Sequence, residues 1–134
     1  SLGKITLGTE IGGAAQYGTE MVAITENGVD NVLRHVGILD GEITRPASPP
    51  QVVAADRHED YVMAPVGGVF EPFVDLGSHV EVGQELGQIH SLERPFDDAY
   101  PVQAETEGMV ISRRQFPRTQ RGDYLVAIVR PFDL

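Results

Sequence analysis

The strongest constraint on the fold is an internal repeat, in which the chain carries nearly the same pattern of small and apolar residues twice. The first copy is marked by Gly68, Gly83, Leu86 and Ile89, and the second by Gly108, Gly122, Leu125 and Ile128. In both copies the last three markers lie three residues apart. A repeat of this kind predicts two similar units related by a pseudo-twofold axis, each too small to bury its own hydrophobic face.

Short runs of β-type residues separated by glycines make up the repeat region. The runs cover residues 61–64, 68–73, 85–90, 100–104, 109–113 and 124–129. The chain also has 15 Gly, 9 Pro and no Trp, which favours a β class with many turns. We therefore expect a mainly β fold, a small sandwich or flattened barrel.

The residues before the repeat have a different pattern. Residues 4–11 predict a strand, and residues 19–36 predict an amphipathic helix with Thr19 as N-cap and Gly37 as its stop. A lone strand must pair with something, and the apolar stripe of the helix needs a surface to cover. Prolines then interrupt regular structure in a connector, within which 51–55 could form a short strand and 56–60 a charged turn. The expected domains are 1–37, 38–60 and 61–134.

Composition excludes several classes of partner. The net charge of -10 over 134 residues argues against binding to nucleic acid or an anionic membrane. No run approaches the roughly 18 apolar residues that a membrane span requires, and no signal peptide opens the chain. The absence of Cys excludes disulfides and cysteine-built metal sites. We expect a cytoplasmic protein.

The repeat resembles the biotinyl/lipoyl-like hammerhead domain. The resemblance rests on Ala64-Pro65-Val66-Gly67-Gly68, Gly77-Ser78-His79-Val80 and Gly83-Gln84-Glu85-Leu86. Carrier members of that fold attach their cofactor to a lysine at the hairpin tip between the two halves. The corresponding residues 90–99 contain no Lys, and Lys4 is the only lysine of the chain. We therefore expect neither biotin nor lipoate to be attached.

The whole chain resembles the C-terminal portion of the succinylglutamate desuccinylase/aspartoacylase family, and most of all its acetyl-diaminobutyrate deacetylase members of the ectoine-degradation type. The motifs are the segments 8–13, 28–39, 115–117 and 122–125. The resemblance implies a zinc-dependent hydrolase, a deacylase that cleaves the amide bond of a small N-acyl amino-acid derivative. It also implies that residues 1–37 are the last strand and helix of an α/β catalytic domain, and that the β domain follows it.

One catalytic residue is implied by this resemblance. The family places a general-base glutamate in a Glu-hydrophobic-Gly pattern, which Glu10 matches in Thr9-Glu10-Ile11-Gly12. The zinc ligands of the family, in a His-x-x-Glu motif and a second His, precede that strand. The four histidines of this chain, His35, His58, His79 and His90, are single and lack ligand spacing. We expect the zinc ligands to lie outside this chain, which would then be an inactive C-terminal fragment by itself.

Two further interpretations concern the β region. Glu93 and Arg94, in the hairpin between the two copies, are candidates for the substrate entrance, with a solvated charged loop as the alternative. Arg113 and Arg114 are expected on an exposed surface. The competing function is a non-catalytic β interaction or oligomerisation module without cofactor attachment, and a homo-oligomer is left open in either case.

Overall fold

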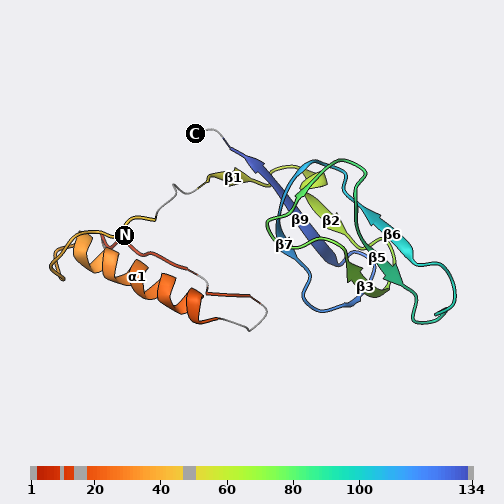
Figure 1. The fold of residues 1–134 in the computed structure, drawn as a ribbon, viewed down its shortest axis with the longest axis horizontal. Helices are drawn as coiled ribbons and strands as arrows, with labels where there is room; N and C mark the ends of the chain where they lie inside the picture. Colours follow the sequence, from red (N-terminus) through yellow and green to blue (C-terminus); the bar gives the residue numbers. More distant parts are fainter. Residues whose placement is uncertain (1–2, 10, 14–17, 47–50, 133–134) are drawn as a thin grey trace. The chain divides into compact units, whose positions relative to one another are not determined.

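The computed structural model describes residues 3–9, 11–13, 18–46 and 51–132. The chain divides into two compact units, Ser1–Pro50 and Gln51–Leu134, which are drawn in Figure 1 with most of their elements labelled. No helix within the described ranges combines the length and the apolar character that crossing a bilayer requires.

The first unit contains the predicted helix, α1 (Thr19–His35). Its N-cap is Gly18, without a side-chain hydrogen bond, so the prediction of Thr19 as the cap is wrong by one residue. The predicted stop is confirmed: Gly37 has a φ of 76°, and the amide of Ile38 donates to the carbonyl of Leu33 at 2.9 Å. Glycine adopts this left-handed conformation without the steric cost that a Cβ imposes.

The predicted strand over residues 4–11 does not form in the described residues. Residues 4–9 follow an extended path without strand hydrogen bonding, and both Ile5 and Leu7 are largely exposed, at 91% and 71%. A strand is defined by pairing with a neighbouring backbone, so β-type residues alone are insufficient to form one. No residue of α1 is buried either, although Leu7, Gly8 and Thr9 line a pocket together with Ile24, Val29 and Val32 of its apolar side.

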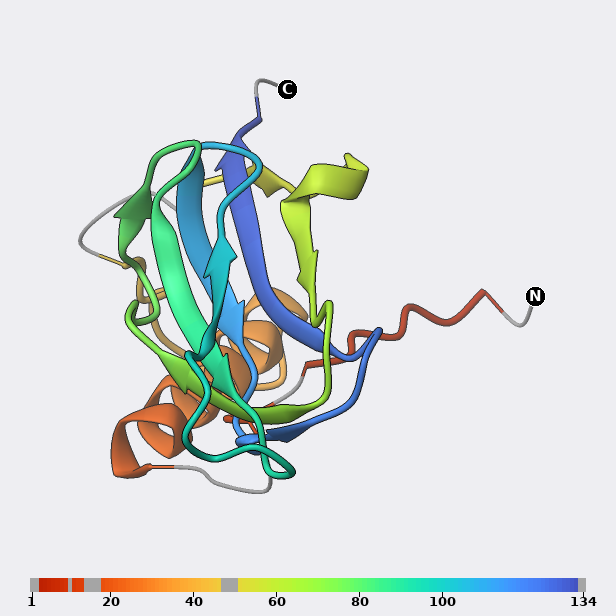
Figure 2. The ribbon, with the colours of Figure 1, turned by 90° about the vertical axis from the view of Figure 1, so that its right-hand side faces the viewer.

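The second unit consists of short antiparallel strands. Its elements are β1 (Val53–Ala54), the 3₁₀ helix η1 (His58–Asp60), β2 (Tyr61–Met63), β3 (Gly68–Pro72), β4 (His79–Val80), β5 (Glu85–His90), β6 (Tyr100–Gln103), β7 (Gly108–Arg113), β8 (Arg118–Thr119) and β9 (Tyr124–Pro131). One sheet has the order β1-β9-β7-β4, with β2 also paired to β9, and the other has the order β6-β5-β3-β8. Figure 2 shows β9 lying between β7 and β2. The mainly β class is confirmed, and the six strand runs expected in the repeat region are all present.

The two copies of the repeat exchange short strands that the sequence pattern did not reveal. β4 belongs to the first copy but pairs with β7 of the second, through His79↔Met109 and Val80↔Gly108. β8 belongs to the second copy but pairs with β3 of the first, through Gly68↔Thr119 and Val69↔Arg118. Each sheet therefore requires strands from both copies.

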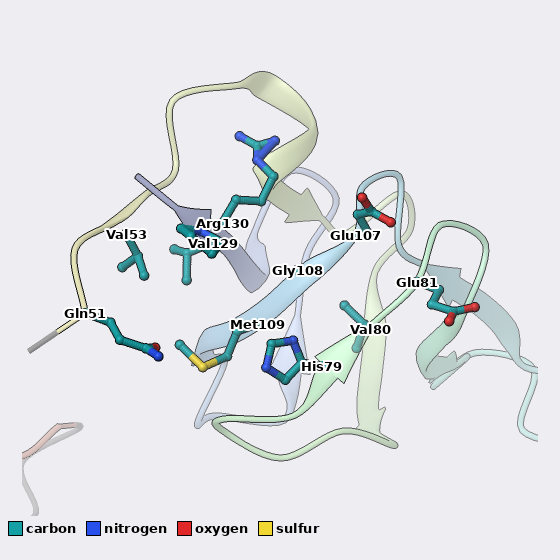
Figure 3. A pocket seen from close by; sticks show the side chains of 11 residues that line it. Gln51, Val53, His79, Val80, Glu81, Glu107, Gly108, Met109, Val129 and Arg130 are labelled. Carbon is teal, nitrogen blue, oxygen red and sulfur yellow. The ribbon is translucent and has the colours of Figure 1, made fainter. Parts of the chain in front are cut away.

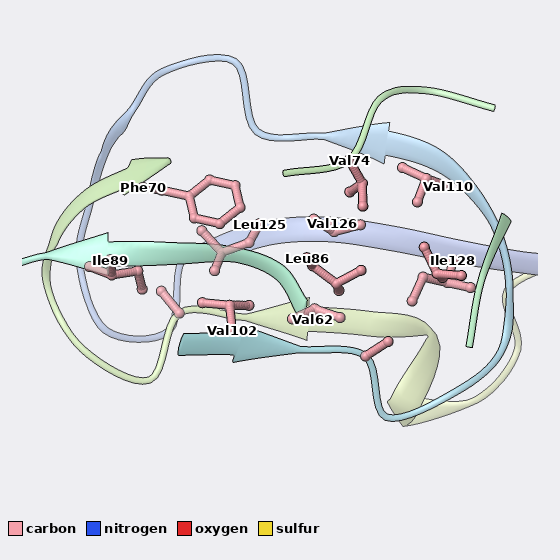
Figure 4. Close-up of a cluster of buried hydrophobic side chains, with 13 residues drawn as sticks. Val62, Phe70, Val74, Leu86, Ile89, Val102, Val110, Leu125, Val126 and Ile128 are labelled. Atoms are coloured by element: carbon pink, nitrogen blue, oxygen red, sulfur yellow. The ribbon is translucent and has the colours of Figure 1, made fainter. Parts of the chain in front are cut away.

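A single hydrophobic core lies between the two sheets (Figure 4). The repeat markers Leu86, Ile89, Leu125 and Ile128 are all at most 2% exposed and belong to it. The backbone turns are matched as well, since the amide of Gly83 donates to the carbonyl of Ala104 and that of Gly122 donates to the carbonyl of Ala64, both at 2.8 Å. Each copy thus holds the turn of the other, as the sequence repeat predicts.

Candidate functional site

The hairpin between the two copies, residues 91–99, carries the candidate entrance residues. The Oγ of Ser91 accepts a hydrogen bond from the amide of Arg94 at 3.0 Å, and the amide of Asp97 donates to the carbonyl of Arg94 at 3.1 Å. Arg94 Nη1 lies 3.7 Å from Asp97 Oδ2, and their side chains are 77% and 60% exposed. Glu93 is exposed too. The structure therefore places both predicted residues on one exposed loop.

A polar cluster lies at the base of this hairpin, on the strands that lead into it. Glu71 on β3 is directly opposite Gln88 on β5. Its Oε2 accepts a hydrogen bond from Gln88 Nε2 at 2.7 Å and lies 2.7 Å from His90 Nε2. The hydrogen bond from Gln88, followed by that from His90, lowers the pKa of the Glu71 carboxyl. The cluster keeps a carboxylate charged next to the hairpin, because its charged form receives both hydrogen bonds.

The residues that the family resemblance assigns to chemistry are not brought together in the described ranges. Glu10 lies outside the described residues. Across the rest of the chain, the described His, Asp and Glu residues form no group of three or more that could hold a metal ion. His79 is the first residue of β4.

Arg113 and Arg114 are not the exposed surface pair that the sequence suggested. Arg113 Nη1 donates to the carbonyl of Val74 and to Asp75 Oδ1, both at 2.9 Å. Arg114 Nη2 donates to the carbonyl of Arg118 at 2.8 Å and lies 2.9 Å from Asp123. Their side chains are only 33% and 24% exposed. The sequence did not indicate that these two adjacent arginines bind turns of the backbone. Their partners are carbonyls and carboxylates of those turns, which no motif marks.

A pocket of about 350 Å³ lies over β1, β4, β7 and β9. Figure 3 shows its lining, in which Met109 lies beside His79, the residue opposite it in the sheet. Val53 and Val129 add apolar surface, while Glu81, Glu107 and Arg130 supply charge. The pocket contains neither Glu93 nor Arg94, so it is separate from the predicted entrance residues.

Comparison with known proteins finds a relative among the curated sequences. The N-alpha-acetyl-L-2,4-diaminobutyric acid deacetylase of Halomonas elongata is 32% identical over 126 residues. The alignment covers 94% of this chain and 37% of that protein. This chain therefore spans little more than a third of the length of the curated relative it matches. A scan against protein-family models gives no match.

Solved structures with a similar fold agree with this relative. The product-bound ectoine utilization protein EutE of Ruegeria pomeroyi matches with a TM-score of 0.78 and 30% identity, over 90% of this chain and 36% of that one. A succinylglutamate desuccinylase/aspartoacylase of Rhodobacter sphaeroides matches with a TM-score of 0.77 and 27% identity, over 87% of this chain and 37% of that one. In sequence and in fold, this chain is therefore similar to the C-terminal portion of the succinylglutamate desuccinylase/aspartoacylase family, and the resemblance predicted from its motifs is confirmed.

Proposed function

We propose that this chain is the C-terminal portion of a zinc-dependent deacylase that hydrolyses the amide bond of an N-acyl amino-acid derivative, for example acetyl-diaminobutyrate, in the cytoplasm. The observation that carries the proposal is the 32% identity to a diaminobutyric acid deacetylase over 94% of the chain. Because the chain covers 37% of that relative, the activity proposed is that of a longer protein containing this chain.

The described residues of this chain do not fit a zinc site. They provide no group of three or more His, Asp or Glu that could hold a metal ion, and a catalytic zinc site uses three protein ligands. The proposal therefore places every zinc ligand outside this chain. The contribution of this chain to the chemistry is limited to Glu10 and to the surface of the 91–99 hairpin.

Glu10 is proposed as the general base. A positioned carboxylate can accept a proton from the attacking water and later deliver it to the leaving amine. The support is the family pattern Glu-hydrophobic-Gly, which the chain carries as Glu10-Ile11-Gly12. The two glycines that follow, Gly12 and Gly13, have no side chains and so would allow a substrate or another backbone to approach closely.

Glu93 and Arg94 are proposed to line the substrate entrance. The Arg94 guanidinium is 77% exposed and contacts Asp97 at 3.7 Å, so it retains donors that could bind the carboxylate of an amino-acid derivative. Glu93, next to it, could attract a substrate amine. A substrate with both groups, such as a diamino acid, matches this pair of opposite charges.

We further propose that the second unit is of the biotinyl/lipoyl-like hammerhead type, serving here as a scaffold. The support is the pair of interlocked copies, which exchange β4 and β8 between the sheets. Covalent attachment of biotin or lipoate requires an amine, and the hairpin has no lysine. The proposal therefore includes no attached cofactor.

The test is a kinetic assay of the longer, zinc-loaded protein with N-acetylated diamino acids. Replacing Glu10 with Gln should lower kcat by about 10²–10⁴-fold, the contribution of a general base. Replacing Arg94 with Met should raise KM with little change in kcat, because uniform substrate binding is lost. Arg121→Met, on an exposed turn of the second copy, is the control for the charge change. A Glu10→Gln variant with turnover within a few fold of the unmodified protein would contradict the role of Glu10.

A further inference from the structure

The two copies of the β unit are closed in different ways. In the first copy, β5 continues through residues 91–99 into its neighbour β6, so the strand pair is joined by a covalent hairpin. In the second copy, the corresponding strand β9 pairs with β2, which comes from the start of the unit. No hairpin joins β9 to β2, and the adjoining ends of the two strands must be held together by contacts alone.

A buried ion pair lies at this junction. Asp60, directly before β2, is 0% exposed. Its Oδ2 accepts hydrogen bonds from the amide of Arg57 at 2.9 Å and from Arg130 Nη2 at 3.0 Å. Arg130, on β9, is 19% exposed and also contacts Asp56 Oδ1 at 3.1 Å. A charge removed from water in this way is tolerated only when it is paired and hydrogen-bonded, so each partner depends on the other.

Several weaker contacts follow the same seam between residues 52–61 and 130–132. β1 pairs with the end of β9 through Val53↔Pro131 and Ala54↔Arg130. The amide of Phe132 donates to the carbonyl of Val52 at 2.9 Å. Within residues 52–61 themselves, the hydroxyl of Tyr61 donates to the carbonyl of Ala55 at 3.1 Å. Most of these groups are at least partly exposed, and a two-residue strand is too short to persist by itself.

We propose that Asp60 and Arg130 form a latch, the non-covalent counterpart of the 91–99 hairpin, which holds residues 51–57 on β9. Opening the latch releases β1 and the start of the unit while the core between the sheets stays folded. The hairpin illustrates the contrast: its own ion pair, Arg94 and Asp97, is exposed and 3.7 Å long, because a covalent loop needs no buried charge to close it. The latch therefore fixes residues 51–57 against β9.

Hydrogen exchange on the full chain tests the latch. The reporters are the amide of Phe132, which bonds to Val52, and the amide of Val110, which donates to the carbonyl of Ser78 at 2.9 Å inside the unit. Replacing Asp60 with Asn should lower the protection of Phe132 by at least about tenfold, because the Arg130 guanidinium then keeps only its exposed carboxylate partner, Asp56, and loses the buried one. Protection of Val110 should change by less than about threefold, since local opening leaves the remaining core closed. Asp97→Asn, the matched change in the hairpin, should affect neither amide.

Two outcomes would overturn the latch. Unchanged protection of Phe132 in Asp60→Asn would mean that the pair does not hold the seam. Equal loss of protection at Phe132 and Val110, including complete unfolding, would mean that the pair holds the whole core. The variant Arg130→Lys is a second test, because it keeps the positive charge but loses the planar fork of the guanidinium. The latch predicts that this variant stays folded and loses protection at Phe132 but not at Val110.

Discussion

The first and second copies of the repeat, residues 61–90 and 100–129, build the same half-structure from largely different residues. Both bury a Leu and an Ile of the repeat, and both place a glycine against a paired strand, Gly68 against β5 and Gly108 against β9. Almost every other position differs. The comparison separates what the fold requires, which is small residues at the turns and apolar residues three apart, from what each copy adds for itself.

The two copies differ in the side chain that accepts a hydrogen bond in the turn before the last strand. In the first copy the amide of Glu81 donates to Gln84 Oε1 at 3.0 Å. In the second copy the amide of Gln120 donates to Asp123 Oδ2 at 2.9 Å, and that carboxylate also binds Arg114 at 2.9 Å. The same backbone turn is thus held by a neutral acceptor in one copy and by a charged one in the other.

The largest predicted effect concerns the glycines that begin β3 and β7. A Cβ at Gly68 would overlap the carbonyl oxygen of His90, and a Cβ at Gly108 would overlap that of Val129. Replacing either by Ala should therefore destabilise the protein by about 1–3 kcal/mol through overpacking. Gly108 also has a φ of 150°, so Gly108→Ala should cost about 1–3 kcal/mol more.

Denaturant unfolding of the two glycine variants measures this difference. Gly77→Ala, at a turn where a Cβ would meet nothing within 4 Å, reports the cost of a positive φ without overlap. Equal stability of the Gly68 and Gly108 variants would show that backbone conformation contributes nothing at β7. A variant as stable as the unmodified protein would contradict the close approach itself.

An effect smaller than that at Gly108 is predicted at the two turns. Asp123→Ala should destabilise by about 1.5–3 kcal/mol, because hydrogen bonds to a charged group are lost, and Gln84→Ala by about 0.5–1.5 kcal/mol. The side chain of Asp123 is 37% exposed, which favours the lower end of its range. Chemical denaturation of both variants, with Arg114→Met as a third, determines whether the charge accounts for the difference. A larger loss in Gln84→Ala than in Asp123→Ala would reverse the comparison.

The sequence predicted most of the β unit because its signals are local. Glycine turns and β-type runs mark β2, β3, β5, β6, β7 and β9, and the repeat markers identified core residues such as Leu86 and Leu125. The exchanged strands β4 and β8 were missed because each has two residues. They are strands by virtue of their distant partners rather than their own composition.

The ion pair between Asp60 and Arg130 was less predictable than the strands, because its two residues are distant in sequence. Asp60 was read as part of a charged turn, yet it is buried by pairing with Arg130, 70 residues away. Residues 4–11 have the composition of a strand, but without a neighbouring strand that composition produced only an extended segment in the described residues. Pairing is a property of the assembled chain, which neither periodicity nor propensity encodes.

The smallest predicted effect is a pH dependence confined to the first copy. Gln88 lowers the pKa of Glu71 there, whereas the second copy has Ala127 at the position corresponding to Gln88. Since the pKa of folded Glu71 lies below its unfolded value, the stabilisation it provides is present above the unfolded pKa and is lost as the pH falls through the folded pKa.

Gln88→Ala should raise the pKa of Glu71, measured by an NMR titration of its carboxyl carbon. Gln103→Ala, on the adjacent strand β6, should leave it unchanged. An unaltered Glu71 titration in Gln88→Ala would mean that His90, 2.7 Å from the carboxylate, sets the pKa instead, and His90→Ala would then produce the rise.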